Sequence, residues 1–75
     1  MMILSGNIRS YRMAKDISQE DLADICDLHR TYIGSVESGE RNVTLSTLET
    51  LAKALNVSVP QLLTKRVLEN DKQQQ

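Results

Sequence analysis

The chain has 75 residues, enough for one domain and too few for two, and its 40% hydrophobic and 25% charged residues are typical of a folded globular protein. The net charge of −1 does not indicate binding to nucleic acid through overall attraction, so any such binding would depend on a few placed contacts. A single cysteine excludes an internal disulfide framework. No apolar run reaches the about 18 residues of a membrane span, and residues 1–4 are too short for a signal peptide, so we expect a cytoplasmic protein without a membrane partner.

Turn and cap signals predict five short helices and no strand, which is an all-α fold. The first helix is expected over about residues 4–15, where apolar residues recur at helical spacing until Asp16 stops it. The second is expected over about residues 19–26, because Ser18 and Asp21 form a capping-box pattern at its start. Asp27 then breaks the helix, since aspartate tolerates the left-handed backbone conformation.

The third helix is predicted over about residues 30–38, with Gly39 as its stop. A capping box at Ser46 and Glu49 opens the fourth helix, and Asn56 stops it. A second capping-box pattern opens the fifth helix, which is expected to run to about Leu68. We therefore expect one folded domain over residues 1–68 and a polar, disordered tail over residues 69–75.

The segment QEDLADICDLHRTYIGSVES, residues 19–38, fits a helix–turn–helix unit. Such a unit needs two helices that cross steeply at a short turn, and therefore a small residue at the crossing point. Ala23 meets that need, and Asp27, four residues later, supplies a turn residue that accepts a positive φ. Leu28, Ile33 and Val36 are the apolar residues expected to pack the second helix of the unit on the core.

The longer run ISQEDLADICDLHRTYIGSVESGERNVTLSTLETLAKALNVSVPQLL resembles the Xre/lambda-repressor-like family of helix–turn–helix regulators. The segments HRTYI and RNVTL look especially like the controller proteins of restriction–modification systems. The resemblance implies a compact five-helix domain that binds double-stranded DNA and regulates transcription. It places the third helix in the major groove and the second across the DNA backbone.

The resemblance also implies which side chains meet DNA. Arg30 would read a guanine edge through two hydrogen bonds, although an exposed arginine can also be a plain solvated charge. Gly34 would allow the backbone to approach the DNA closely, and Tyr32 is left open between a core position and a groove-facing one. The remaining expected contacts are polar or phosphate contacts from Gln19, Thr31, Ser35, Arg41, Asn42 and Thr44.

Other singled-out residues receive structural interpretations. The resemblance pairs Arg12 with Glu37 in a partly buried salt bridge between the first and third helices. Cys26 and His29 are the only residues of their types, so we expect no metal site and no cofactor. We find no nucleophile–base pair and no phosphate-binding glycine loop, so we expect no catalytic function and no small-molecule ligand.

The fifth helix carries more apolar residues than one face can bury on so small a core, which predicts a homodimer on a symmetric operator. Its expected interface residues are Val59, Leu62, Leu63 and Val67. Two alternatives remain open at this point. One is an antitoxin or phage-type repressor of the same fold, and the other is a protein-interaction module that has lost DNA binding.

Overall fold

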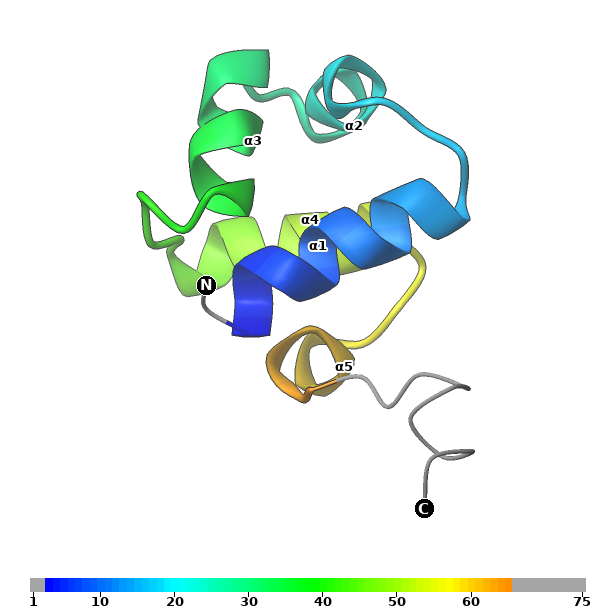
Figure 1. The fold of residues 1–75 in the computed structure, drawn as a ribbon, viewed down its shortest axis with the longest axis vertical. Coiled ribbons are helices and arrows are strands. Elements are labelled where there is room, and N and C mark those ends of the chain that lie inside the picture. Colours follow the sequence, from blue (N-terminus) through cyan, green and yellow to red (C-terminus); the bar gives the residue numbers. More distant parts are fainter. Residues whose placement is uncertain (1–2, 66–75) are drawn as a thin grey trace.

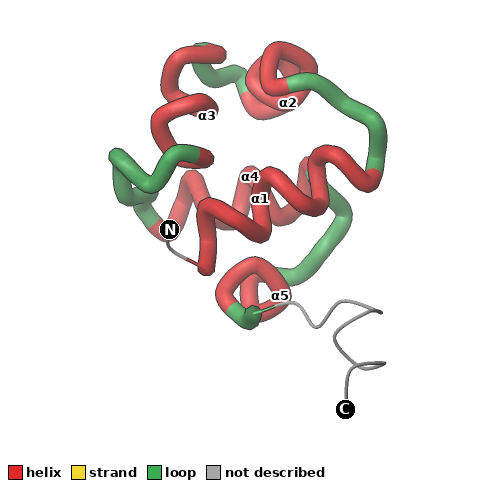
Figure 2. Tube along the Cα trace, viewed as in Figure 1, coloured by secondary structure: helices red, strands yellow, loops and turns green. Residues whose placement is uncertain are grey.

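Five helices follow one another in a computed structural model that describes residues 3–65. They are α1 (Ile3–Ala14), α2 (Gln19–Cys26), α3 (Arg30–Glu37), α4 (Leu45–Ala54) and α5 (Val59–Leu63). α2 and α3 lie together on one side of α1, and α5 lies on the other (Figure 1). Only helices and connecting loops occur within residues 3–65 (Figure 2), which confirms the predicted all-α fold.

Residues in the left-handed conformation separate the helices. Asp16, Asp27 and Asn56 have φ values of 59°, 58° and 59°, and Gly39 has a φ of 81°. Aspartate, asparagine and glycine adopt this conformation at lower cost than other residues, so each ends the preceding helix or its last turn. All four stops agree with the prediction from the sequence.

Side-chain caps start three of the helices, and one of them differs from the prediction. Ser18 and Ser58 form the expected capping boxes at the starts of α2 and α5. The expected box at Ser46 is wrong, because α4 begins earlier, at Leu45, with Thr44 as its N-cap. The Thr44 hydroxyl oxygen accepts a hydrogen bond from the Thr47 amide at 3.2 Å. Both residues offer a hydroxyl, and the extended backbone at Thr44 decides which one caps.

Aliphatic side chains from all five helices meet in one core. α2 packs on α3 and α4, α1 packs on α3 and α5, and α4 also packs on α5. Because the chain has neither Phe nor Trp, Leu, Ile, Val and Ala fill most of the core. The fully buried apolar residues are Ile8, Leu22, Ile33, Leu51, Leu55 and Leu62.

The fifth helix is shorter than predicted, because it ends at Leu63 and the backbone of Thr64 is extended. The buried Asn7 side chain supplies the physical reason. Its amide nitrogen lies 2.8 Å from the carbonyl oxygen of Leu62 and 2.7 Å from that of Thr64, so it donates to carbonyls at the end of α5. Val67 and Leu68 lie outside the described residues.

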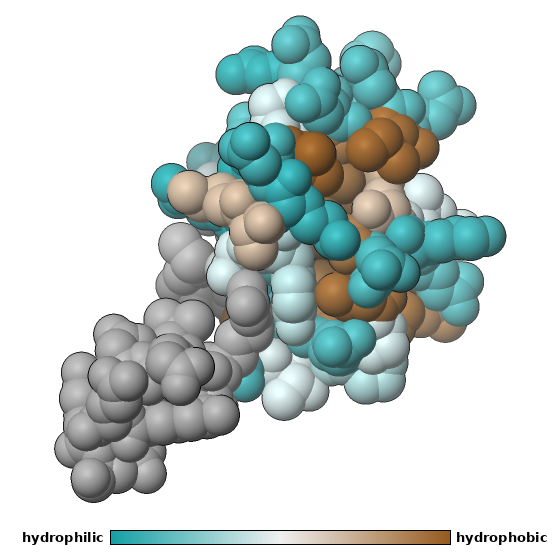
Figure 3. All heavy atoms as spheres, turned by 90° about the vertical axis from the view of Figure 1, so that its right-hand side faces the viewer, coloured by the Kyte–Doolittle hydropathy of each residue, from teal (hydrophilic) through white to brown (hydrophobic). Residues whose placement is uncertain are grey.

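Exposed apolar side chains are scattered over the surface. Figure 3 shows them on one face as small areas between hydrophilic residues. Leu62 is fully buried within its own chain, so it is not available to a partner, and this corrects the predicted interface. Leu63 is 51% exposed and remains available. None of the helices in residues 3–65 is both long and apolar enough to cross a membrane.

Candidate nucleic-acid interface

α2, a three-residue turn and α3 form the helix–turn–helix unit. Ala23, 2% exposed, is buried in α2, and its carbonyl oxygen accepts the Leu28 amide at 2.8 Å beyond the turn. Asp27 is left-handed, with φ 58° and ψ 45°, and this single residue redirects the chain between the two helices. Ile33 and Val36 bury the inner face of α3. The outer face of α3 is consequently held out toward solvent.

That outer face carries four of the predicted DNA-contacting residues. Positions 30, 31, 34 and 35 follow helical spacing, so they lie on one side of α3. Arg30 and Thr31 are exposed, and Gly34 and Ser35 are half-buried. Arg30 forms no ion pair with any other residue in the described part of the chain, so its guanidinium is free to meet a ligand.

A buried ion pair fixes α3 against α1. The Arg12 Nε donates to Glu37 Oε2 at 2.7 Å, and Arg12 Nη2 donates to Glu37 Oε1 at 3.0 Å. The Arg12 and Glu37 side chains are only 12% and 3% exposed. The hydrogen bond with Glu37 raises the pKa of Arg12 above its ordinary value, against the opposing effect of burial. The Arg12–Glu37 pair that the family resemblance implies is therefore present, as a bidentate salt bridge with two hydrogen bonds.

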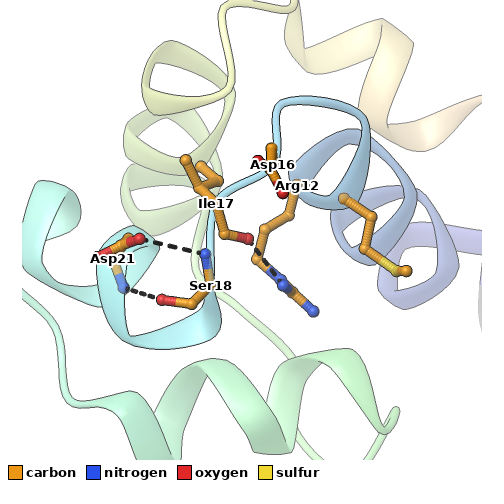
Figure 4. Close-up of a pocket in the computed structure, with 6 residues that line it drawn as sticks. Arg12, Asp16, Ile17, Ser18 and Asp21 are labelled. Atoms are coloured by element: carbon orange, nitrogen blue, oxygen red, sulfur yellow. Dashed lines mark hydrogen bonds between the residues drawn. The ribbon is translucent and has the colours of Figure 1, made fainter.

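The same arginine also holds the connection between α1 and α2. Its Nη1 donates to the carbonyl oxygen of Ile17 at 2.9 Å. Figure 4 shows the Arg12 side chain alongside this connection, near Ile17 and the reciprocal hydrogen bonds of Ser18 and Asp21. The start of α2 is thus tied to α1 and, through Glu37, to α3.

Gln19 joins this network at the first residue of α2. Its Nε2 donates to Glu37 Oε1 at 3.1 Å, so the amide group has a defined orientation. The family resemblance implies a phosphate contact for Gln19, but no pattern in the sequence indicates this hydrogen bond to Glu37. One N–H of the Gln19 amide is used inside the protein, and the other is not needed for this contact.

Tyr32 and Arg41 form a second contact that no pattern in the sequence indicates. The Arg41 guanidinium carbon lies 5.5 Å from the centre of the Tyr32 ring, a cation–π arrangement. Tyr32 is half-buried and packs against the core, so it lies between the two positions that the sequence left open. Arg41 and the neighbouring Asn42 are exposed in the loop after α3. The ring therefore supports a cation beside the outer face of α3.

The comparison with known families agrees with this geometry. A family described as helix–turn–helix matches residues 8–62, which is most of the chain. This chain belongs to the helix–turn–helix family. The match contains α2, α3 and α4 entirely, most of α1 and all but the last residue of α5, so it includes all the predicted DNA-contacting residues.

Relatives within the helix–turn–helix family include regulators of this size. The control protein C.SmaI of Serratia marcescens is 67% identical over 69 residues, covering 92% of this chain and 82% of that protein. The restriction–modification controller protein C.AhdI of Aeromonas hydrophila has a structure with a TM-score of 0.78 and 41% identity, covering 81% and 92% of the two chains. SinR, a master regulator for biofilm formation solved in complex with DNA, has a TM-score of 0.78 at 31% identity, covering 81% and 98%. The resemblance inferred from the sequence is confirmed.

The Arg12–Glu37 ion pair predicts how three variants rank in their free energy of unfolding. Arg12→Ala leaves the Glu37 carboxylate buried without its cation and should lower the free energy of unfolding by about 3–5 kcal/mol. Glu37→Ala leaves the more exposed Arg12 behind and should cost less. The double variant Arg12→Met/Glu37→Leu should cost less than Arg12→Ala, because no buried charge remains unpaired. Urea unfolding measures all three, with the exposed Glu40→Ala as control. Equal stability of Arg12→Ala and Glu40→Ala would contradict this account.

Proposed function

We propose that this protein is a sequence-specific, double-stranded DNA-binding transcription regulator that acts as a homodimer on a symmetric operator. The observation that carries the proposal is the exposed polar face of α3, which begins with the unpaired Arg30. In this arrangement α3 lies in the major groove, and α2 crosses the DNA backbone. Arginine suits base reading because its planar group can donate two hydrogen bonds to guanine O6 and N7.

Residues around α3 supply the proposed backbone contacts. Gln19 lies at the first turn of α2, where the free backbone amides also favour a phosphate. Arg41 and Asn42 extend the same surface beyond the end of α3 and are exposed. We also propose Thr44 as a backbone contact. Its hydroxyl caps α4, so Thr44 has a structural role as well. Thr31 and Ser35 are the further polar contacts on α3.

We propose that the protein regulates the genes of a restriction–modification system. It would act in the cytoplasm, where the DNA of those genes lies. Support comes from the 67% identity with a protein named as a control protein and from the likeness to a restriction–modification controller protein. These two proteins also favour the controller function over the antitoxin and interaction-module alternatives. DNA upstream of the protein's own gene is therefore the first operator to test.

A homodimer follows from the small size of one DNA-binding unit. A single module makes few phosphate and base contacts, so two copies are needed for useful affinity at cellular salt concentration. Val59 and Leu63 lie four residues apart on α5, and therefore on one side of it. Leu63 is 51% exposed, and Val59 is half-buried. We propose this side of α5 as the interface, and Val67 as a further member.

Arg30 and Arg41 should differ in what they contribute to DNA binding. Arg30→Ala should cost about 1–3 kcal/mol and remove the preference for one base in each half-site. Arg41→Ala should weaken binding to all sequences about equally and make the salt dependence shallower by about one unit per subunit. Binding of both variants to the operator and to single-base variants, across a salt series, separates the two effects.

Loss of positive charge alone predicts the same result for both arginines, so each variant serves as the control for the other. If Arg30→Ala retains the full base preference, α3 does not read sequence through this residue. If wild-type protein binds neither its own upstream DNA nor a duplex selected from a random pool, the proposed function is wrong.

Substitution of Gly34 should change stability and operator affinity in opposite directions. A Cβ added at Gly34 would meet Gln19 Oε1 at 3.7 Å, which is an ordinary contact. Gly34→Ala should therefore stabilise α3 by about 0.5–1 kcal/mol, because alanine loses less conformational entropy in a helix. The same methyl group should reduce operator affinity by holding the backbone away from the DNA. Thermal unfolding and a shift assay test the pair of effects, and unchanged affinity would rule out close approach at Gly34.

Leu63 tests the proposed dimer without disturbing the core. Leu63→Glu should shift the protein toward monomer and weaken operator binding together, because a charge replaces an exposed apolar side chain at the interface. Met13→Glu is the matched control, since Met13 is 60% exposed and lies in the last turn of α1, next to the connection to α2. Sedimentation equilibrium at micromolar concentration measures the shift. A wild-type protein that is only monomeric under these conditions would contradict the proposed interface.

A further inference from the structure

A shallow hollow opens where α1, α2 and α3 meet. Its volume is about 230 Å³, and it is lined by Arg9, Arg12, Gln19, Gly34, Glu37 and Ser38. Arg9 has no role in the family-based interpretation of the sequence or in the ion-pair network. It is exposed and forms no ion pair with another residue among those at positions 3–65.

The hollow has a net positive charge. Glu37 is neutralised by Arg12 through two hydrogen bonds, so the carboxylate does not offset a second cation. Arg9 lies three residues before Arg12 in α1, about 4.5 Å along the helix axis and on the same side of it. The guanidinium of Arg9 is therefore the uncompensated charge of the hollow.

Hydrogen-bond donors also remain for an oxygen-rich anion. The Gln19 amide nitrogen uses one N–H for Glu37, so its second N–H is left over. Arg12 has five N–H groups, and its three internal hydrogen bonds leave two of them. The Ser38 hydroxyl donates to the Ser35 carbonyl at 3.0 Å, so it is not a donor for a ligand.

The position of the hollow identifies the anion. Gly34 belongs both to the hollow and to the outer face of α3, where the base-reading residues lie. Its missing side chain leaves the hollow open on that face. An anion that enters while α3 lies in the major groove must therefore come from the DNA beside that groove, and the anion available there is a backbone phosphate.

We infer that this hollow binds one phosphodiester group of each half-site and that Arg9 is its principal cationic donor. The inference rests on the proposed function and extends it, because it adds a phosphate contact from α1. It also gives the orientation of Gln19 a purpose. The Gln19 amide nitrogen is held by Glu37, and both residues line the hollow, so the ion pair that stabilises the fold also positions a phosphate donor.

Phosphate ethylation interference on the duplex selected by wild-type protein from a random pool tests the inference. Wild-type protein should be blocked by ethylation at a defined set of phosphates, and Arg9→Ala should become insensitive at one of them in each half-site. The salt dependence of operator binding should become shallower by about two units for the dimer, with base preference unchanged. Arg9→Gln, which keeps much of the side-chain length, should behave in the same way.

Lys53→Ala is the matched control, because Lys53 is exposed beside Ile25 and Ala54, in a separate hollow between α2 and α4. It removes the same charge and should leave the interference pattern unchanged. The phosphate site is wrong if ethylation blocks Arg9→Ala at every phosphate at which it blocks wild-type protein. It is also wrong if Arg9→Ala changes the salt dependence of binding no more than Lys53→Ala does. Arg30→Ala, measured on the same duplex, then shows independently whether α3 reads sequence. Failure of wild-type protein to select any duplex overturns the proposed function instead.

Discussion

The buried pair of Arg12 and Glu37 is the interaction on which the position of the outer face of α3 depends. Arg12 extends from α1 to the carboxylate at the end of α3 and to the carbonyl oxygen of Ile17 in the connection to α2. Glu37 also accepts from Gln19 at the start of α2. One arginine and one glutamate therefore fix the relative positions of three helices. Because both charges are withdrawn from water, the pair favours this geometry strongly only while it is complete.

Short helices make such a constraint necessary. α2 and α3 each have eight residues, and isolated helices of that length are not stable in water. Burial of Leu22 and Ile33 supplies the packing that keeps them helical. Left-handed Asp27 and the capping box at Ser18 restrict how the two helices can enter and leave the turn. Apolar packing thus stabilises the helix–turn–helix unit, and the ion pair fixes the orientation of the outer face of α3 relative to α1.

The charge distribution explains why placement matters more than total charge in the proposed function. With a net charge of −1, the chain has little general attraction to DNA. Residues 16–40 contain seven acidic residues, yet Glu37 among them is neutralised inside the fold. Arg9, Arg30 and Arg41 then remain as cations on or beside one surface. In the proposed dimer each of these contacts would occur twice, which would raise the affinity of a small, weakly charged protein for DNA.

The sequence by itself determined the features that depend on neighbours within a few residues. Asp16, Asp27, Gly39 and Asn56 stop helices because their own backbones accept a positive φ. The capping boxes after Ser18 and Ser58 need only residues three positions apart, so pattern was sufficient to find them. The helix–turn–helix spacing and the family resemblance then indicated that the outer face of α3 is the surface to propose for DNA contact.

Only the tertiary structure decided features that join residues far apart in the chain. Asn7 meets the end of α5 and stops it at Leu63, which no pattern near Leu63 indicates. Tyr32 supports Arg41, and Gln19 turns toward Glu37, because the packing of α3 brings each pair together. Leu62 points inward although it looked available to a partner. Hydropathy along a chain shows which residues are apolar, but the direction of each side chain is set by the helices that pack around it.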